Sequence, residues 1–492
     1  MALSPLDWPS ELLLSLLELL PLNDLLSMTT VNKSIRTLAL PLAYSTVETR
    51  WTWHRLPPVI QLLQSLLERR ELAGYIRNLR LVGNGFDDRT ELSEPPTFPL
   101  DADLLGKATE VIESTRVPFT KLWIDELHSG SVDAIVALLV TMAPNLTSLH
   151  LGPNFTVRSR LWGGIFHYAL CGPPNSCNLP TYQNLRSVET SWRTKEWHHI
   201  AVCNTADVLP LFYLPRIENL SVSIDNPVEF AWPSSHPPAP SSLASLDIFR
   251  LRESRIGPVL SVLEGLQRLH WHWSYQPDLD EQVSKGVLEL EKAATALNQV
   301  ADTLTDLTIG ALTRPRISDG DYDPPPLELR GSLHLSRLGK LTKLRLPWVF
   351  LMGWSKSSSS ARKLLGLLPL SLELLELTSD LNDHDEWEWH NDDSIINAIK
   401  VQLTSQSISR CPCLRRIVLP IPGEYSEMTD QREVPTSTYM SAIDSEPWSI
   451  RRANAASWFC VDGQCLEFLA SLVENENMSM GNDCLVLSKG AR

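Results

Sequence analysis

Residues 144–154 read PNLTSLHLGPN, and this short stretch decides the fold. Leu146, Leu149 and Leu151 form the pattern apolar-x-x-apolar-x-apolar, in which the last two leucines fall on one face of a β-strand. Pro144 stands just before the pattern, and proline favours an extended conformation in the residue that precedes it. The stretch therefore predicts a short strand that follows the end of a helix and buries its leucines on one side.

The same pattern recurs along the chain. Its eleven occurrences begin at Ile76, Phe119, Leu146, Leu185, Ile217, Leu243, Leu266, Leu304, Leu341, Leu372 and Leu414. Between them, apolar residues at helical spacing predict helices over 104–112, 132–139, 283–300 and 395–403. This alternation resembles leucine-rich repeats, although the mean interval of about 34 residues exceeds their usual period of roughly 20–29. We predict an α/β fold in which residues 51–422 form an irregular leucine-rich repeat solenoid, a curved parallel sheet with helices on the convex side.

Short polar residues follow some of the predicted strands. Asn84 and Asn154 occupy the turn position in two units, and Asp225 and Asp380 occupy it in two others. In leucine-rich repeats such a side chain hydrogen-bonds backbone groups of the turn, and the other units lack it. A βαβ-type α/β domain is the alternative interpretation, because it also alternates helices with parallel strands. It would need longer, fully apolar strands than these.

The first fifty residues are predicted to form a separate helical unit. Over residues 9–20 the polar side chains Glu11, Ser15 and Glu18 form one narrow stripe, and leucine fills most other positions. A helix that is apolar over most of its circumference must be covered on more than one side. Two interpretations follow: the unit is a cap that seals the first repeat, or it binds a partner protein.

Residues 8–12 (WPSEL) and 19–26 (LLPLNDLL) are followed by VNKSIR at 31–36 and LALPLAY at 38–44. These anchors, in this order and spacing, resemble an F-box domain. Trp8 replaces the usual leucine before the proline, and Ile35 stands where many members carry tryptophan. The long repeat region with its serine- and proline-rich insertions looks similar to the F-box/leucine-rich proteins of filamentous fungi.

The resemblance implies a substrate-recognition subunit of a cullin-RING ubiquitin ligase, without catalysis of its own. In that family the F-box binds the Skp adaptor, which connects it to the cullin and the RING subunit. Carried onto this sequence, the positions for adaptor contact or its immediate support are Pro9, Glu11, Leu12, Leu16, Leu25, Val31 and Ile35. The alternative is a solenoid interaction scaffold with no link to a ubiquitin ligase. Exposed outer faces of Leu12, Leu16 and Ile35 would favour adaptor binding, and burial against the first repeat would favour a cap.

The solenoid would present its target-binding surface along the strands. Each repeat strand has one central residue that points away from the buried leucines, and stacked strands place these residues in a row. The row mixes both charges with an aromatic residue, as expected of a protein-recognition surface. The predicted substrate-binding positions are Arg80, Trp123, His150, Glu189, Asp247, His270, Arg345 and Glu376.

Composition restricts the other partners. The formal net charge of −15 disfavours nucleic acids and anionic membranes, because the chain repels phosphate groups. The apolar start has no basic region, so it does not resemble a signal peptide, and the eight cysteines include no C-x-x-C pair. We expect an intracellular protein of the cytoplasm or nucleus. Residues 423–492 are predicted to be a polar segment followed by a capping helix over 449–473.

The sequence contains no common catalytic motif: it has no phosphate-binding loop, G-x-S-x-G or H-E-x-x-H. We therefore expect no enzyme activity, cofactor or metal. His198, His199 and Cys203 would be the centre of an unrecognised metal site if the chain were an enzyme after all. The alternating segment 270–273 (HWHW) predicts a strand with both tryptophans in the core. The acidic segment 383–390 offers a weak cation site, although such runs are usually solvated loops.

Overall fold

In the computed structural model of the chain, ten of the eleven predicted repeat units contain a strand where the leucine pattern places it. The structure describes residues 9–51, 57–83, 96–156, 159–190, 205–224, 226–275, 285–313, 324–355, 364–390, 392–404, 411–420, 448–454 and 483–489. The chain divides into two compact units, residues 1–249 and 250–492. The α/β class and the alternation of parallel strands with helices are confirmed, as are three short N-terminal helices, and the arrangement is consistent with a leucine-rich repeat solenoid.

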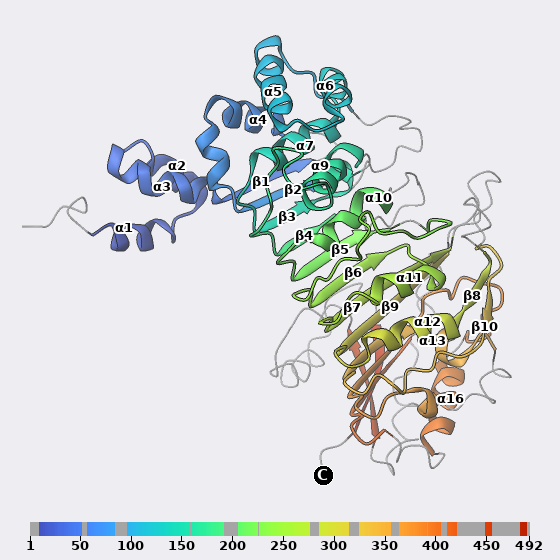
Figure 1. The fold of residues 1–492 in the computed structure, drawn as a ribbon. Coiled ribbons are helices and arrows are strands. Elements are labelled where there is room, and N and C mark those ends of the chain that lie inside the picture. The colour runs from blue at the N-terminus through green and yellow to red at the C-terminus, as the bar shows by residue number, and fades with distance from the viewer. Residues whose placement is uncertain are drawn as a thin grey trace, which may run out of the picture. The chain divides into compact units, whose positions relative to one another are not determined.

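The first unit begins with three short helices, and its six strands then alternate with further helices (Figure 1). Its helices are α1 (Ser10–Leu17), α2 (Leu22–Met28), α3 (Lys33–Ser45), α4 (Val59–Glu68), α5 (Ala102–Thr115), α6 (Thr120–His128), α7 (Val132–Met142), α8 (Pro153–Thr156), α9 (Arg160–Leu170) and α10 (Thr205–Val208), with 3-10 turns η2 (Arg70–Tyr75) and η3 (Leu209–Tyr213). Its strands are β1 (Thr46–Trp51), β2 (Asn78–Gly83), β3 (Ser148–Leu151), β4 (Ser187–Glu189), β5 (Asn219–Ser223) and β6 (Ser245–Phe249).

These six strands pair in parallel and in chain order, from β1 to β6. The repeat leucines lie on the face that the helices cover: Leu79, Leu81, Leu149 and Leu151 are at most 1% exposed. Each strand is short because only two or three side chains point into this core, and the backbone then turns into the next helix. Leucine pairs at i and i+2 therefore fix both the length and the register of the sheet.

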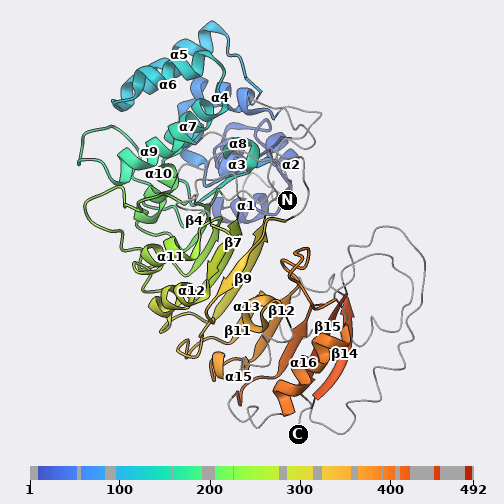
Figure 2. The same ribbon diagram turned by 90° about the vertical axis from the view of Figure 1, so that its right-hand side faces the viewer.

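The second unit repeats this arrangement, with other elements at its carboxyl end. Its strands are β7 (Arg268–Tyr275), β8 (Val287–Glu289), β9 (Asp306–Thr313), β10 (Glu328–Arg330), β11 (Lys343–Pro347), β12 (Leu374–Thr378), β13 (Arg416–Leu419), β14 (Trp448–Asn454) and β15 (Asp483–Lys489). Its helices are α11 (Glu253–Leu260), α12 (Leu290–Leu297), α13 (Trp348–Met352), α15 (Leu364–Leu367) and α16 (Asp392–Thr404), with the 3-10 turn η4 (Asn298–Val300). Figure 2 shows β7, β9, β11 and β12 side by side, as their pairing requires.

The neighbours β7, β9, β11, β12 and β13 are parallel, whereas β15 pairs antiparallel with β13 and β14 pairs antiparallel with β15. The sequence pattern did not predict this antiparallel pair. The capping helix predicted over 449–473 is wrong for its first six residues, because residues 448–454 form β14; residues 455–473 lie outside the described residues. A separate two-stranded parallel sheet joins β8 to β10, so the helix predicted over 283–300 is in fact a strand, β8, followed by α12 and η4.

One predicted strand is a helix. The pattern at Phe119, Leu122 and Ile124 lies in and just before α6, and Trp123 is completely buried there. Phe119, Trp123 and Leu127 follow one another at intervals of four residues, which is the spacing of one helix face. The Trp123 indole also donates to the Ala134 carbonyl oxygen at 3.0 Å, which fixes the ring in the core. Trp123 is therefore not one of the outward residues of the strand row.

The first unit buries two carboxyl groups at the start of α9. Asp133 accepts hydrogen bonds from the backbone N–H groups of Leu161 (2.8 Å) and Trp162 (3.2 Å), and Ser159 donates its hydroxyl to Asp207 at 2.7 Å. Burial raises the pKa of Asp133 to about 7, and the charge of Asp207 raises it further in the same direction. The backbone N–H groups of a helix start favour the ionised form, and here their effect is smaller than that of desolvation.

None of the helices in the described part of the chain is long and apolar enough to cross a membrane.

Candidate functional site

Helices α1–α3 form a small bundle whose ends are set by proline and asparagine. Pro9 and Pro21 are the residues that precede α1 and α2, where a missing N–H group costs little. Asn32 caps α3, because its side-chain oxygen accepts the backbone N–H of Ile35 at 2.8 Å. The inner faces share one cluster of buried residues: Leu17, Leu25, Ile35, Ala39 and Ala43. In the first unit α3 also contacts η2 and β1, which places the bundle beside the first strand (Figure 1).

The outer sides of α1 and α2 carry apolar residues that nothing in the described chain covers. Leu12 is 55% exposed, Leu16 46% and Leu19 80%. We use the name apolar outer face for six residues that are all at least 43% exposed: Leu12, Leu16, Leu19, Leu22, Leu26 and Val31. Leu12 and Leu16 lie four residues apart on α1, and Leu22 and Leu26 lie four residues apart on α2, so each helix presents its own apolar stripe. Leu19 and Val31 follow just after the ends of α1 and α2.

The seven predicted adaptor-binding residues therefore divide into two groups. Pro9, Glu11, Leu12, Leu16 and Val31 are exposed. Leu25 and Ile35 belong to the core of the bundle and are 7% and 4% exposed. Ile35 is buried within the bundle, so it supports the apolar outer face and does not belong to it. Sequence reasoning missed Leu19, Leu22 and Leu26 as parts of this face, although their helical spacing was visible.

The predicted row of outward strand residues is present in the register of both units. In the first unit Glu48, Arg80, His150, Glu189, Ser221 and Asp247 are successive cross-strand neighbours. In the second unit His270, Thr308, Arg345, Glu376 and Val418 are successive neighbours. Leucine spacing alone was enough to place these residues opposite one another, because side chains in a strand alternate with a period of two.

Neighbours in the row form ion pairs across the strands. In the first unit Arg80 Nε lies 3.3 Å from Glu48 Oε2, and His150 Nδ1 lies 2.9 Å from Glu189 Oε2. In the second unit Arg345 Nε lies 3.2 Å from Glu376 Oε1. Asp247 and His270 are half-buried, and Val418 is buried. The row is thus a charged surface whose groups are held in place by their neighbours, a property that suits protein recognition more than catalysis.

Asp380 hydrogen-bonds the backbone of a strand, whereas the expected partners were backbone groups of the turn. Its Oδ2 atom accepts the backbone N–H of Ala311, in β9, at 2.8 Å, and burial raises the pKa of this carboxyl group. Asn154 is 3% exposed and lies directly against Gly83, where a Cβ atom would stand 2.2 Å from the amide oxygen. Asn84 and Asp225 lie outside the described residues.

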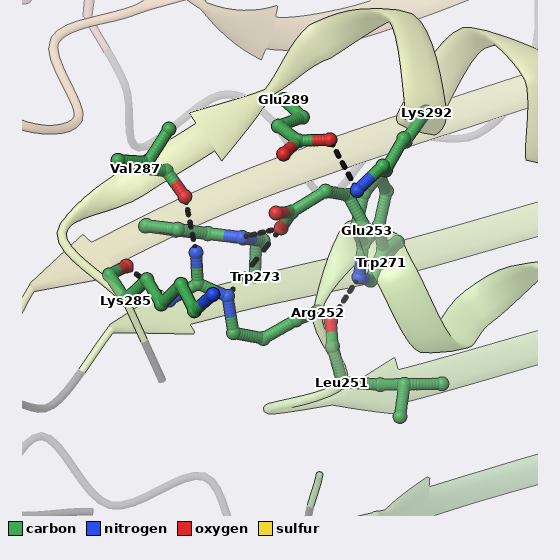
Figure 3. Close-up of polar contacts among 9 residues, drawn as sticks. All are labelled: Leu251, Arg252, Glu253, Trp271, Trp273, Lys285, Val287, Glu289 and Lys292. Carbon is green, nitrogen blue, oxygen red and sulfur yellow. Dashed lines mark hydrogen bonds and ion pairs between the residues drawn. The ribbon is translucent and has the colours of Figure 1, made fainter. Parts of the chain in front are cut away.

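Figure 3 shows a polar cluster on the other face of β7 that sequence reasoning missed. Arg252 is 2% exposed, and its guanidinium donates to the carbonyl oxygens of Lys285 (2.8 Å) and Val287 (2.6 Å). It lies 4.8 Å from the ring centroid of Trp273, whose indole donates to Glu253 Oε2 at 2.8 Å. The cluster anchors β8 to β7 and has no exposed chemistry, so its function is structural. The two tryptophans of the HWHW segment are buried, as predicted.

In the described part of the chain, no group of three or more His, Cys, Asp and Glu residues could hold a metal ion. In the acidic segment the side chains of His384, Trp387 and Trp389 are buried, while Asp383 and Asp385 face solvent. His198, His199 and Cys203 lie outside the described residues.

No protein-family profile matches the chain, and no curated protein is significantly similar to it.

Proposed function

We propose that this chain is a substrate-recruiting subunit of a cullin-RING ubiquitin ligase, which binds the Skp adaptor through α1–α3 and a target protein through the strand row. The single observation that carries the proposal is the apolar outer face. Six of the ten exposed large apolar side chains in the described residues fall between positions 12 and 31. Such a concentration is typical of a surface that a partner covers.

The exposure of α1 separates this proposal from the cap alternative. A cap would bury the outer sides of Leu12 and Leu16 against the first repeat, and both are about half exposed. An adaptor helix laid along α1 and α2 would remove these leucines from water, and such interfaces are dominated by apolar area. The contacts of α3 with η2 and β1 are those of a cap, so α3 attaches the bundle while α1 and α2 remain open.

In this proposal the chain accelerates ubiquitin transfer by proximity. The strand row holds the target, the bundle holds the adaptor, and the effective concentration of target lysines near the charged enzyme rises. No side chain of this chain needs to touch the reacting atoms. The alternative, an interaction scaffold without a ligase link, uses the same strand row and leaves the apolar outer face for a different partner.

The test is co-purification of the full chain with the Skp adaptor. Removing residues 1–50 would also remove most of β1 and disturb the sheet, so point variants are sharper. We expect the double variant Leu12→Glu/Leu16→Glu to abolish binding without unfolding the chain, because both side chains are exposed. Leu370→Glu is the matched control, since Leu370 is 63% exposed and lies outside the bundle. Folded full-length chain that captures no adaptor would establish the scaffold alternative.

A further inference from the structure

On the strand surface of the second unit, the cation of each cross-strand ion pair is much more exposed to solvent than the carboxylate. Lys343 Nζ lies 3.4 Å from Asp306 Oδ1, and the two side chains are 64% and 29% exposed. Arg345 and Glu376 are 51% and 13% exposed. In both pairs the cation stands outside and the carboxylate sits underneath. Burial of the Glu376 carboxyl also raises its pKa, which is the expected effect of removing it from water.

In the corresponding pairs of the first unit the cation and the carboxylate differ much less in exposure, and one pair is reversed. Arg80 and Glu48 are 51% and 42% exposed, and Arg186 and Glu218 are 55% and 43% exposed. In the His150–Glu189 pair the acid is the more exposed partner. A solvent-side ligand would therefore meet both charges in the first unit and mainly positive charge in the second.

Two further cations extend this surface. Arg268 is exposed at the start of β7 and is the cross-strand neighbour of Asp306, which is in turn the neighbour of Lys343. Arg416 begins β13 and lies close enough to Glu376 to favour its ionised form. We call Arg268, Lys343, Arg345 and Arg416 the basic stripe. It runs along the amino-terminal ends of β7–β13 in a chain whose net charge is −15.

At the register position of Arg268, Lys343 and Arg416 the first unit carries uncharged residues, whereas Arg80 stands in its central row as Arg345 does in the second. Thr46, Asn78, Ser148, Ser187, Asn219 and Ser245 are successive neighbours there. They hydrogen-bond to one another in part, since Asn78 donates to Thr46 Oγ1 at 3.0 Å. The concentration of cations is therefore a property of the second unit and not of the repeat as such.

We infer that the basic stripe binds an acidic segment of the target protein, one rich in Asp and Glu. This inference rests on the proposed function and specifies its target. Guanidinium and ammonium groups that are already oriented by partly buried carboxylates lose little conformational entropy when they meet a second carboxylate. Electrostatic complementarity of this kind selects partners and speeds encounter. Nucleic acid is a second polyanion, and the DNA probe in the test below distinguishes it from an acidic peptide.

The test measures fluorescence anisotropy of a labelled peptide of alternating Glu and Ser with the full chain at low salt. A peptide of alternating Lys and Ser and a single-stranded DNA of equal length are the comparison probes. We expect the acidic peptide to bind best, and Lys343→Glu/Arg345→Glu to weaken its binding about tenfold. Arg70→Glu/Arg186→Glu is the matched control in the first unit and should change the affinity little, because both side chains are exposed and lie outside the strand row.

Lys343→Gln/Arg345→Gln removes the charges without placing new acids beside Glu376, and circular dichroism checks that each variant is folded. The inference is overturned if folded wild-type chain does not bind the acidic peptide, if the second-unit variants bind it unchanged, or if the Lys peptide or the DNA binds as well. Adaptor capture is measured separately and does not involve these residues. A failure of the proposed ligase function is therefore distinguishable from a failure of this inference.

Discussion

The two units bury charge in opposite ways. In the first unit the buried carboxyl group of Asp133 is held by the backbone N–H groups of Leu161 and Trp162 at the start of α9, and not by a cation. In the second unit Glu253 is buried beside the guanidinium of Arg252, Nε to Oε2 3.4 Å, with an indole on the same oxygen. A carboxyl group held by dipoles can take up a proton, whereas a guanidinium keeps its charge. The first site should therefore respond to pH, and the second to the loss of one partner.

The largest expected effect is that of Arg252→Leu. It leaves Glu253 buried without its cation and removes the donors to the Lys285 and Val287 carbonyl oxygens. Breaking a buried pair in this way costs about 3–5 kcal/mol of unfolding free energy. Hydrogen exchange at the amides of α11 and β8 measures the loss locally. Unchanged exchange there would show that the two sites do not differ as described.

The second prediction concerns pH. Because the folded pKa of Asp133 is about 7 against an ordinary value of 3.8, the folded state keeps a proton that the unfolded state loses in between. The unfolding free energy of the first unit should fall as pH rises from about 4 to about 7, by at most about 1.4 kcal/mol per pH unit. Asp133→Asn resembles the protonated acid and should flatten this dependence. Urea denaturation followed at several pH values tests it, and an equal slope in the variant would contradict the assignment.

The third prediction uses the close packing around Asp207. A Cβ atom on Gly163, in α9, would stand 2.4 Å from the Cβ and 2.7 Å from the Cα of Asp207. Gly163→Ala should therefore destabilise the first unit by about 1–3 kcal/mol through overpacking. Gly106→Ala in α5 is the control, because no atom lies within 4 Å of its Cβ position. That change should stabilise the unit by about 0.5–1 kcal/mol. Thermal unfolding of both variants gives the comparison.

The smallest effect is expected at the rim of the second-unit site. Lys292 pairs with Glu289 on the surface of α12, next to the buried cluster (Figure 3). Both side chains are exposed to water, so Lys292→Ala should change the unfolding free energy by less than about 0.5 kcal/mol. A change as large as that of Arg252→Leu would mean that burial is not what distinguishes the two pairs. The same hydrogen-exchange measurement on α11 and β8 decides this.

The repeat strands could be predicted because they depend on local spacing. The pattern apolar-x-x-apolar-x-apolar predicts ten strands and the row of residues that points away from their buried side. The failure at Trp123 has a local cause as well: residues 119, 123 and 127 share a helix face, and that second periodicity outweighs the strand pattern. Strand β1 was also missed, although Val47, Thr49 and Trp51 alternate.

Other features could not be predicted from spacing. The polar cluster joins Arg252 to the carbonyl oxygens of residues 285 and 287, which only the tertiary fold brings together. The order of exposure in the ion pairs of the second unit depends in the same way on how deeply each strand residue sits in the sheet. The apolar outer face could be predicted in part: the sequence shows the helical spacing of its leucines, but not that their side chains are exposed.

The chain-order pairing of β7, β9, β11, β12 and β13 also sets a length. Neighbouring strands lie roughly 4.8 Å apart, so the row from His270 to Val418 spans roughly 19 Å. An extended peptide advances roughly 3.3 Å per residue, and one that crosses all five strands needs about six residues. The width of these five strands therefore selects the length of a segment that crosses them. A shorter segment reaches only some of the strands, and a longer one also meets β15, which pairs with β13.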